Sequence, residues 1–324
     1  MKNKFSLGFF PTPLTKLKNL SKVYSSYHLF IKRDDHTGLA LGGNKTRKLE
    51  YLIQDAIEQG CDTVITAGAQ QSNHCRQTVA ACALANLKCH LILGGENPEI
   101  YNGNLLLSKI LGATIHFSGE NRKGEDISEI YNQLKSQGAK PYIIPYGGSN
   151  ITGALGYVNA VKELKEQLNE QKLKIDYIFF ASSSGGTQSG LILGKMLYGL
   201  KSELIPINID KDETSGIKME DSIFEMINRG REILQINESF EYSNIKLIKE
   251  YDKPGYGVVT PDEIEAINLL ARTEGILLDP VYTARAFGGM MDYLDKGLLP
   301  KKSNILFWHT GGLPAIFNYG FKLK

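Results

Sequence analysis

The sequence predicts an α/β protein with parallel β-strands and helices on both faces of its sheets. Short β-branched or aromatic runs alternate along the chain with longer runs of helical periodicity. This alternation is typical of parallel sheets packed between helices. The chain has 324 residues, 42% of them hydrophobic, which is enough for two domains or one large α/β unit.

Each predicted strand is a short apolar run, and these runs lie at 62–66, 87–93, 113–117, 141–145, 177–181, 204–209 and 304–309. Each predicted helix is a longer periodic run, and these runs lie at 45–59, 74–86, 102–111, 125–137, 154–170, 187–200, 261–274 and 283–295. In the first helix, one face carries an apolar stripe that is expected to pack into the core: Leu49, Leu52, Ile53, Ala56 and Ile57. Asn44, just before it, is a typical N-cap residue.

Charge and hydropathy exclude several classes of partner. The net charge is +2, and the basic residues are dispersed without a basic face or an aromatic-interleaved basic stretch. This pattern argues against nucleic acid or a membrane surface as a partner. No apolar run approaches the length of a membrane span, and prolines interrupt the N-terminal apolar run, so we expect no signal peptide. The expected partner is a small molecule.

Cysteine usage points to a reducing compartment. The chain has four cysteines, Cys61, Cys75, Cys82 and Cys89, and no two of them form a Cys-x-x-Cys motif. Without a secretion signal, the cytoplasm is the expected location. Cys75 and Cys82 share a helix face, so we expect them to be buried structural residues and assign no metal site.

One lysine is predicted to point into the core. Lys45 lies four residues before Leu49 on the inward stripe, whereas Arg47 is expected on the opposite side and Lys48 at the flank. Burial and the helix dipole both disfavour the charged form of Lys45. A partly neutral amine is a nucleophile, and its usual use is a Schiff base with a carbonyl compound. The alternative is a lysine whose ammonium group reaches water while its stem lies along the core.

Glycine-marked loops follow several predicted strands, where ligands of open α/β sheets bind. The loop 182–190 contains Ser184-Gly185-Gly186-Thr187 and opens into a helix, which makes a phosphate cradle. It has no lysine of its own and lacks a dinucleotide fingerprint. The loop 67–74 could hold a carboxylate by the same physics. For either loop, the alternative is a simple helix cap.

Together, these motifs resemble the pyridoxal-phosphate (PLP) enzymes of the tryptophan synthase β fold, in the branch of D-cysteine desulfhydrase and 1-aminocyclopropane-1-carboxylate (ACC) deaminase. The resemblance rests on Gly-Gly-Asn-Lys-Thr-Arg-Lys-Leu at 42–49 and Gln-Ser-Asn-His at 71–74. It extends from 11–14 and 31–35 to the corners at 147–150, 279–283 and 309–312, and so covers nearly the whole chain.

The resemblance implies a fold type II PLP enzyme with two open twisted parallel-sheet domains and the cofactor in the cleft. A large PLP-binding domain would consist of 1–48 and 157–324, and a small inserted α/β domain would consist of 49–156. The family also implies a homodimer.

Family positions imply roles for individual residues. Lys45 would bind the cofactor covalently, and Asn73 would donate a hydrogen bond to its phenolic oxygen. The phosphate would lie at Ser184, Gly185, Gly186 and Thr187, with Thr283 and Thr310 also near the cofactor. The substrate amino acid would be held by Gln71, Ser72, Asn73, Tyr256 and Tyr282. Of these residues, Lys45, Ser72, Tyr256 and Tyr282 are the expected catalytic groups.

Two positions separate the branches. ACC deaminases carry glutamate where this chain has Thr283, facing the pyridine nitrogen, and leucine where it has Thr310. A neutral hydroxyl strengthens the electron sink less than a carboxylate, which favours β-elimination from D-cysteine to pyruvate, hydrogen sulfide and ammonia. The alternatives are an ACC deaminase that forms 2-oxobutanoate and ammonia, and a non-catalytic α/β protein that binds a phosphate ligand.

Overall fold

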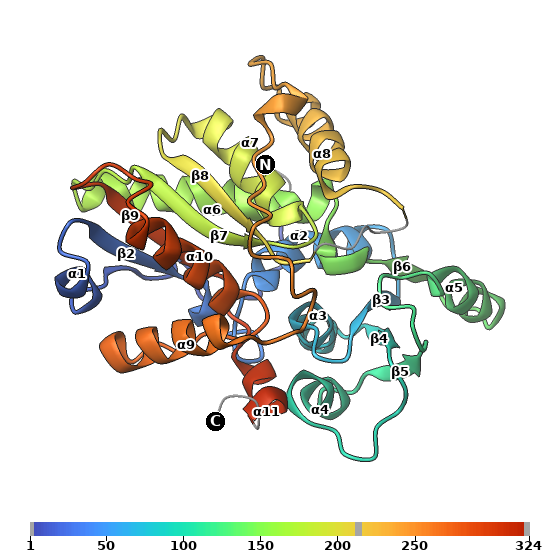
Figure 1. The fold of residues 1–324 in the computed structure, drawn as a ribbon. Coiled ribbons are helices and arrows are strands. Elements are labelled where there is room, and N and C mark those ends of the chain that lie inside the picture. Colours follow the sequence, from blue (N-terminus) through green and yellow to red (C-terminus); the bar gives the residue numbers. More distant parts are fainter. Residues whose placement is uncertain (1–2, 211–215, 321–324) are drawn as a thin grey trace.

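The computed structural model describes residues 3–210 and 216–320 and contains two sheets (Figure 1). The larger sheet has the order β1 (Leu14–Lys16), β2 (His28–Arg33), β9 (Asn304–His309), β7 (Tyr177–Ser182), β8 (Glu203–Asn208). The smaller sheet has the order β5 (Thr114–Phe117), β4 (Lys88–Gly94), β3 (Thr63–Ala69), β6 (Pro141–Ile143). Neighbouring strands are parallel apart from the antiparallel pair β1 and β2. The predicted α/β class is therefore confirmed.

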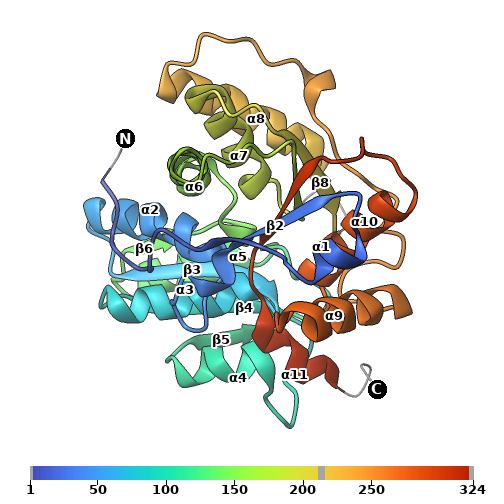
Figure 2. The ribbon, with the colours of Figure 1, turned by 90° about the vertical axis from the view of Figure 1, so that its left-hand side faces the viewer.

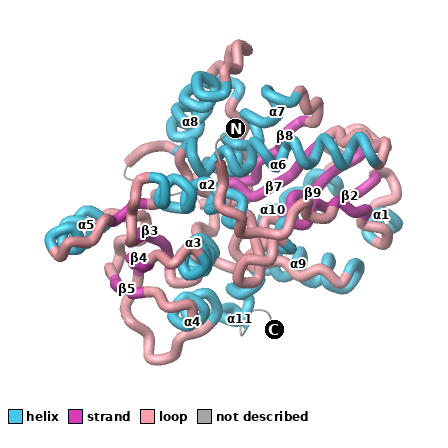
Figure 3. The backbone as a smooth tube through the Cα atoms, turned by 180° about the vertical axis from the view of Figure 1, so that it is seen from behind, coloured by secondary structure: helices cyan, strands magenta, loops and turns pink. Residues whose placement is uncertain are grey.

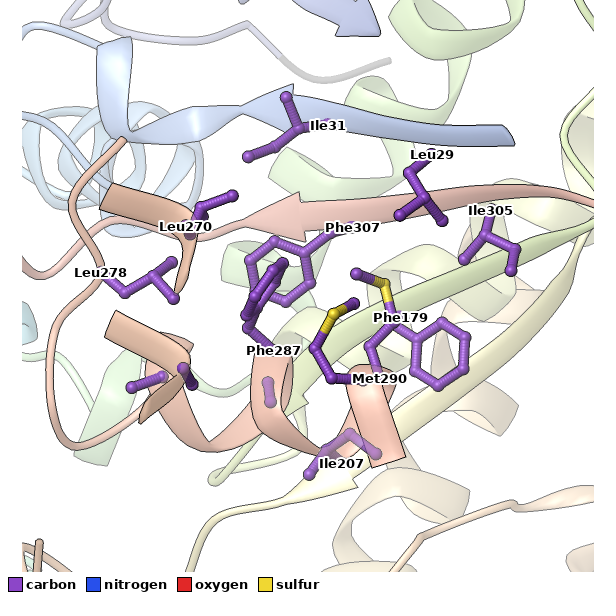
Figure 4. Packing of buried hydrophobic residues seen from close by; sticks show 14 of the residues in the cluster. Leu29, Ile31, Phe179, Ile207, Leu270, Leu278, Phe287, Met290, Ile305 and Phe307 are labelled. Carbon is purple, nitrogen blue, oxygen red and sulfur yellow. The ribbon is translucent and has the colours of Figure 1, made fainter. Parts of the chain in front are cut away.

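Helices cover both faces of the larger sheet (Figures 1 and 2). One face packs against α6 (Ile151–Glu170), α7 (Gly186–Tyr198) and α8 (Met219–Leu234), and the other against α1 (Leu20–Val23), α9 (Pro261–Glu274) and α10 (Thr283–Asp295). Successive residues of β7 divide between the two cores: Ile178 and Phe180 join the first and Phe179 the second. Figure 4 shows the second core, where Phe287 and Phe307 meet edge to face at 5.3 Å.

The smaller sheet is covered in the same way. α2 (Lys45–Glu58), α3 (Asn73–Leu84) and α4 (Gly103–Ile110) contribute to the core on one face, and α5 (Ile127–Ser136) covers the other. The short helix α11 (Ile316–Tyr319) lies beside α4. None of the described helices combines the length and apolar character that a membrane span requires.

The region between the two sheets is occupied by α2 and α6, which pack against each other (Figures 1 and 3). The proposed domain boundaries, after residue 48 and after residue 156, fall within these two helices. The division into a large and a small domain at these points stays a proposal.

Candidate active site

A pocket lies where the loops after β3, β7 and β9 meet the start of α2 and the turn at Tyr146–Gly148. This is the carboxyl edge of both parallel sheets, where ligands of such folds bind. The predicted site residues that line it are Lys45, Ser72, Asn73, Ser184, Gly185, Thr187, Tyr282 and Thr310. The predicted residues outside its lining are Gln71, Gly186, Tyr256 and Thr283.

Lys45 is the first residue of α2, and its side chain points into the pocket. Its Nζ donates a hydrogen bond of 3.1 Å to the carbonyl oxygen of Gly147. Burial lowers the pKa of Lys45 to about 8, because the charged amine loses hydration. A substantial fraction of this amine is therefore neutral near pH 8, as a nucleophile or base requires.

The expectation that only Lys45 points into the interior is wrong, because Arg47 and Lys48 do so too. Both side chains are buried, with exposed fractions of 3% and 1%. Arg47 forms ion pairs with Asp34 at 2.8 Å and Glu163 at 2.9 Å. The first turns of α2 are enclosed by neighbouring segments on several sides, so they have no polar face toward water.

Lys48 lies beside the phosphate loop. Its Nζ donates to the carbonyl oxygen of Gly147 at 3.1 Å and to Ser149 Oγ at 3.3 Å. A Cβ added to Gly186 would come within 2.9 Å of the same Nζ. Burial and the nearby charge of Lys45 hold the pKa of Lys48 well below its usual value. Sequence reasoning missed this residue, although the i, i+3 spacing from Lys45 places both lysines on neighbouring faces of one helical turn.

Asn44 is the N-cap residue of α2, as predicted, but its side chain does not cap the helix. The residue has helical φ and ψ angles of −60° and −23°, and its side chain makes no capping hydrogen bond. Instead, Asn44 Nδ2 donates to Thr187 Oγ1 at 3.2 Å. The amide thus joins the start of α2 to the phosphate loop, because the two helix starts face each other across the pocket.

The start of α7 has the properties of a phosphate site. An α-helix leaves its first N–H groups without helical partners, and the N-cap residue here is Gly185, which has no side chain to bind them. Gly185 has a φ of 76°, a conformation that favours glycine. Ser184 Oγ lies 2.8 Å from Ser149 Oγ at the same edge. With Lys48 beside it, this loop fits a phosphomonoester.

Ser72 and Asn73 begin α3 with groups available to a ligand. Ser72 Oγ accepts a hydrogen bond of 3.2 Å from the N–H of Cys75, which leaves its hydroxyl proton for a second partner. Asn73 Oδ1 accepts bonds of 3.0 Å from both Arg76 and Asn104. The Asn73 amide therefore has only N–H donors to offer to a bound molecule, as a phenolic oxygen would need.

Gln71 faces α4. Its Nε2 donates to the carbonyl oxygen of Asn102 at 3.1 Å, and its Oε1 accepts from the N–H of Asn104 at 2.9 Å. The Gln71 side chain thus supports the start of α4, and its predicted contact with a substrate carboxylate stays a prediction.

Tyr256 and Tyr282 form a pair, of which Tyr282 lines the pocket. Their hydroxyl oxygens lie 2.5 Å apart, and their rings meet edge to face at 5.8 Å. Burial, together with charge interactions between the phenols, raises the pKa of Tyr282 well above its usual value, and burial does the same for Tyr256. Both phenols therefore keep their protons at neutral pH.

The two threonines differ in position. Thr310 lines the pocket, and its carbonyl oxygen accepts from the N–H of Asn44 at 2.9 Å. Thr283 is fully buried, and its hydroxyl donates to Asp279 Oδ1 at 2.7 Å. Burial raises the pKa of Asp279. Thr283 thus presents a neutral group already paired with Asp279, and its contact with a cofactor ring stays a prediction.

An inward lysine, a phosphate cradle and a carboxylate site converge between two parallel sheets, an arrangement that defines a fold type II PLP-dependent enzyme. The family model described as pyridoxal-phosphate dependent enzyme matches residues 5–311. The chain belongs to that family, and its cofactor is PLP. Family membership does not favour the non-catalytic alternative.

Solved structures agree with this assignment. A structure described as an ACC deaminase homologue has 38% sequence identity and a TM-score of 0.90, over 99% of this chain and 95% of that chain. Diaminopropionate ammonia lyase from Escherichia coli has 16% identity and a TM-score of 0.69, over 98% and 88%. A hydrogen sulfide-producing enzyme from Fusobacterium nucleatum has 20% identity and a TM-score of 0.64, over 94% and 96%. The last two support the fold alone.

Proposed function

We propose that the protein is a D-cysteine desulfhydrase, which converts D-cysteine and water to pyruvate, hydrogen sulfide and ammonia. The observation that carries this proposal is Thr283, a buried neutral residue where the ACC deaminase branch carries glutamate. β-Elimination begins with the loss of an α-proton and ends with the loss of a good leaving group, so a weaker electron sink is sufficient for it. Opening a cyclopropane ring that has no α-proton needs a stronger one.

The residues of the pocket would divide the work as follows. PLP, when bound, supplies the electron sink for the bonding electrons released at the substrate α-carbon. Lys45, whose pKa is about 8, is the base that takes the α-proton. The Ser72 hydroxyl and the Asn73 amide hold the substrate carboxylate by donating hydrogen bonds. The protonated pair Tyr256 and Tyr282 is suited to donate a proton to the departing sulfur.

ACC deaminase activity is the second candidate. It is supported by the 38% identity to a structure described as an ACC deaminase homologue. Its product would be 2-oxobutanoate with ammonia. We also propose a cytoplasmic homodimer: the family resemblance supports the dimer, and the four free cysteines, three of them buried, support a reducing location.

The test is to add D-cysteine, L-cysteine and ACC separately to the PLP-loaded protein. Visible absorbance is recorded while sulfide, pyruvate and 2-oxobutanoate are assayed in the same samples. We expect sulfide and pyruvate in equal amounts from D-cysteine. Formation of 2-oxobutanoate from ACC without sulfide would replace this proposal by the second candidate, and an absorbance change with neither product would overturn both.

A further inference from the structure

A buried arginine in α10 holds the segment that carries Tyr256. Arg285 is 3% exposed, and its guanidinium donates to carbonyl oxygens on both sides of Tyr256: Gly255 at 3.0 Å and Val258 at 2.8 Å. The segment between them is Tyr256 and Gly257. Because Gly255 and Gly257 have φ angles of 91° and 72°, the backbone itself constrains Tyr256 weakly.

The same guanidinium is fixed from behind by Glu263. Arg285 Nε donates to Glu263 Oε1 at 2.7 Å. The other carboxylate oxygen accepts from the N–H of Thr260 at 2.7 Å and closes the capping box of α9. Glu263 is 4% exposed, so the ion pair is buried, and its planar fork geometry cannot be reproduced by a lysine.

Arg285 also reaches the end of β8. Its Nη1 donates to the carbonyl oxygen of Ile209 at 2.9 Å, next to Asp210. Asp210 pairs at 3.0 Å with Arg122, which comes from the loop after β5. The Arg122 guanidinium lies 4.5 Å from the centre of the Tyr256 ring. Arg285 therefore holds the backbone next to both residues that Arg122 contacts, Asp210 and Tyr256.

We propose that Arg285, held by Glu263, is a positioning residue that sets Tyr256 against Tyr282 on the substrate side of the pocket. This inference rests on the proposed function, in which the tyrosine pair serves the substrate. Tyr282 is the N-cap residue of α10, and Arg285 lies three residues further along in that helix, so both members of the pair are fixed relative to α10. Loss of the fork releases Tyr256 and leaves Lys45 and the phosphate loop unchanged.

The kinetic test is a double-mutant cycle of Arg285→Lys with Tyr256→Phe in the PLP-loaded protein. Arg285→Lys keeps the charge beside Glu263, but the three N–H donors of its single nitrogen cannot bind Glu263 and three backbone carbonyls together. We expect kcat/KM for D-cysteine to fall on the order of 100-fold, since a misplaced group costs about that much, with the visible absorbance of bound PLP unchanged. The double variant should be no slower than Tyr256→Phe alone. Multiplied losses, or loss of bound PLP, would overturn the proposal.

A second measurement does not depend on the substrate. Amide hydrogen exchange is measured on the PLP-loaded protein without substrate. In Arg285→Lys, exchange in residues 249–259 should become faster, and exchange in residues 45–58 should stay unchanged. Unchanged exchange in 249–259 would contradict the proposal even if D-cysteine proves to be the wrong substrate. If Arg285→Lys does not fold, Glu263→Gln gives the same test in milder form, because it removes the charge and keeps one acceptor.

Two arginine variants serve as controls. Arg272→Lys changes an exposed residue of α9 and should leave both exchange and kcat/KM as they are. Arg47→Lys changes a buried arginine beside the cofactor residues, and it should leave the exchange of 249–259 unaltered. A faster exchange of 249–259 in Arg47→Lys would mean that any buried arginine loosens this segment, which would overturn a specific role for Arg285.

Discussion

The two sides of the pocket are built in different ways. On the cofactor side, Lys45 and Lys48 share one turn of α2, and the phosphate loop forms the start of α7. On the substrate side, Tyr256 and Tyr282 come from separate segments and are joined by contacts between their hydroxyl groups and between their rings. Arg122 and Asp210 join this side from two further loops.

This difference separates what short motifs determine from what tertiary contacts determine. Helix starts present backbone N–H groups and adjacent side chains in a geometry that local sequence specifies. The tyrosine pair depends on contacts between residues far apart in the chain. Substitutions on the cofactor side should therefore affect PLP or folding, whereas those on the substrate side should affect kcat/KM with PLP still bound.

The largest expected effect is that of Lys45→Ala. Without the pocket amine, the protein should show no visible absorbance of covalently held PLP, and turnover should fall to the background of the assay. Absorption spectroscopy and the sulfide assay check both points. Lys162→Ala, at a half-exposed position of α6, is the matched control and should behave like the parent. Turnover that survives in Lys45→Ala would remove the lysine from the reaction.

Arg47→Met should cause the largest loss of stability. It leaves Asp34 without its ion-pair partner and Glu163 with Lys32 alone, and breaking a buried ion pair in this way costs about 3–5 kcal/mol in the free energy of unfolding. Urea unfolding of the PLP-loaded protein measures the loss. Arg229→Met, which breaks the exposed pair with Glu225, should change stability by less than about 1 kcal/mol. Equal losses in the two variants would show that the buried ion pairs of Arg47 stabilise the fold no more than an exposed pair does.

Arg47 also marks where sequence reasoning stopped. A single apolar stripe assumes one buried face, but α2 is enclosed on several sides, and the partners of Arg47 lie 13 and 116 residues away. β2 was missed for the same reason: Lys32 interrupts its apolar pattern, yet it is fully buried through its contact with Glu163 at 2.5 Å. No local pattern contains these partners.

Other elements could be predicted because their signals are local. Helix α9 has the bounds that the sequence predicted, 261–274, and its capping box is formed by two residues at its start, Thr260 and Glu263. Strand 304–309 also has its predicted bounds, since it is a continuous apolar run. α8 was missed although Ile223, Met226 and Ile227 carry helical spacing and are buried, so that signal was present in the sequence.

Lys48→Met tests whether this lysine belongs to the cofactor side. The negative charge of a bound phosphate favours the protonated form of Lys48, and a hydrogen bond from a charged group contributes about 1.5–3 kcal/mol, so PLP affinity should fall roughly 10- to 100-fold. Titration of the stripped protein with PLP, followed by visible absorbance, measures the affinity, with Lys162→Met as the control. At saturating PLP, kcat/KM should return close to the parent value. A lowered kcat/KM with normal PLP affinity would place Lys48 on the substrate side instead.

The last expected effect is a pH dependence that only the cofactor side should show. Since the pKa of Lys45 is about 8, its neutral fraction rises about tenfold per pH unit below pH 8 and levels off above it. The rate at which stripped protein captures PLP should follow this curve between about pH 6 and pH 10, after correction for the titration of PLP measured with a simple amine. An ordinary lysine, with its pKa near 10.5, would give a rate that still rises beyond pH 8.

The tyrosine pair should add no step in this range, because the pKa of each phenol is raised well above its usual value. A plateau near pH 8 in the parent and in Tyr256→Phe alike would assign the titration to Lys45, whereas a plateau that moves in Tyr256→Phe would show that the two sides of the pocket are coupled.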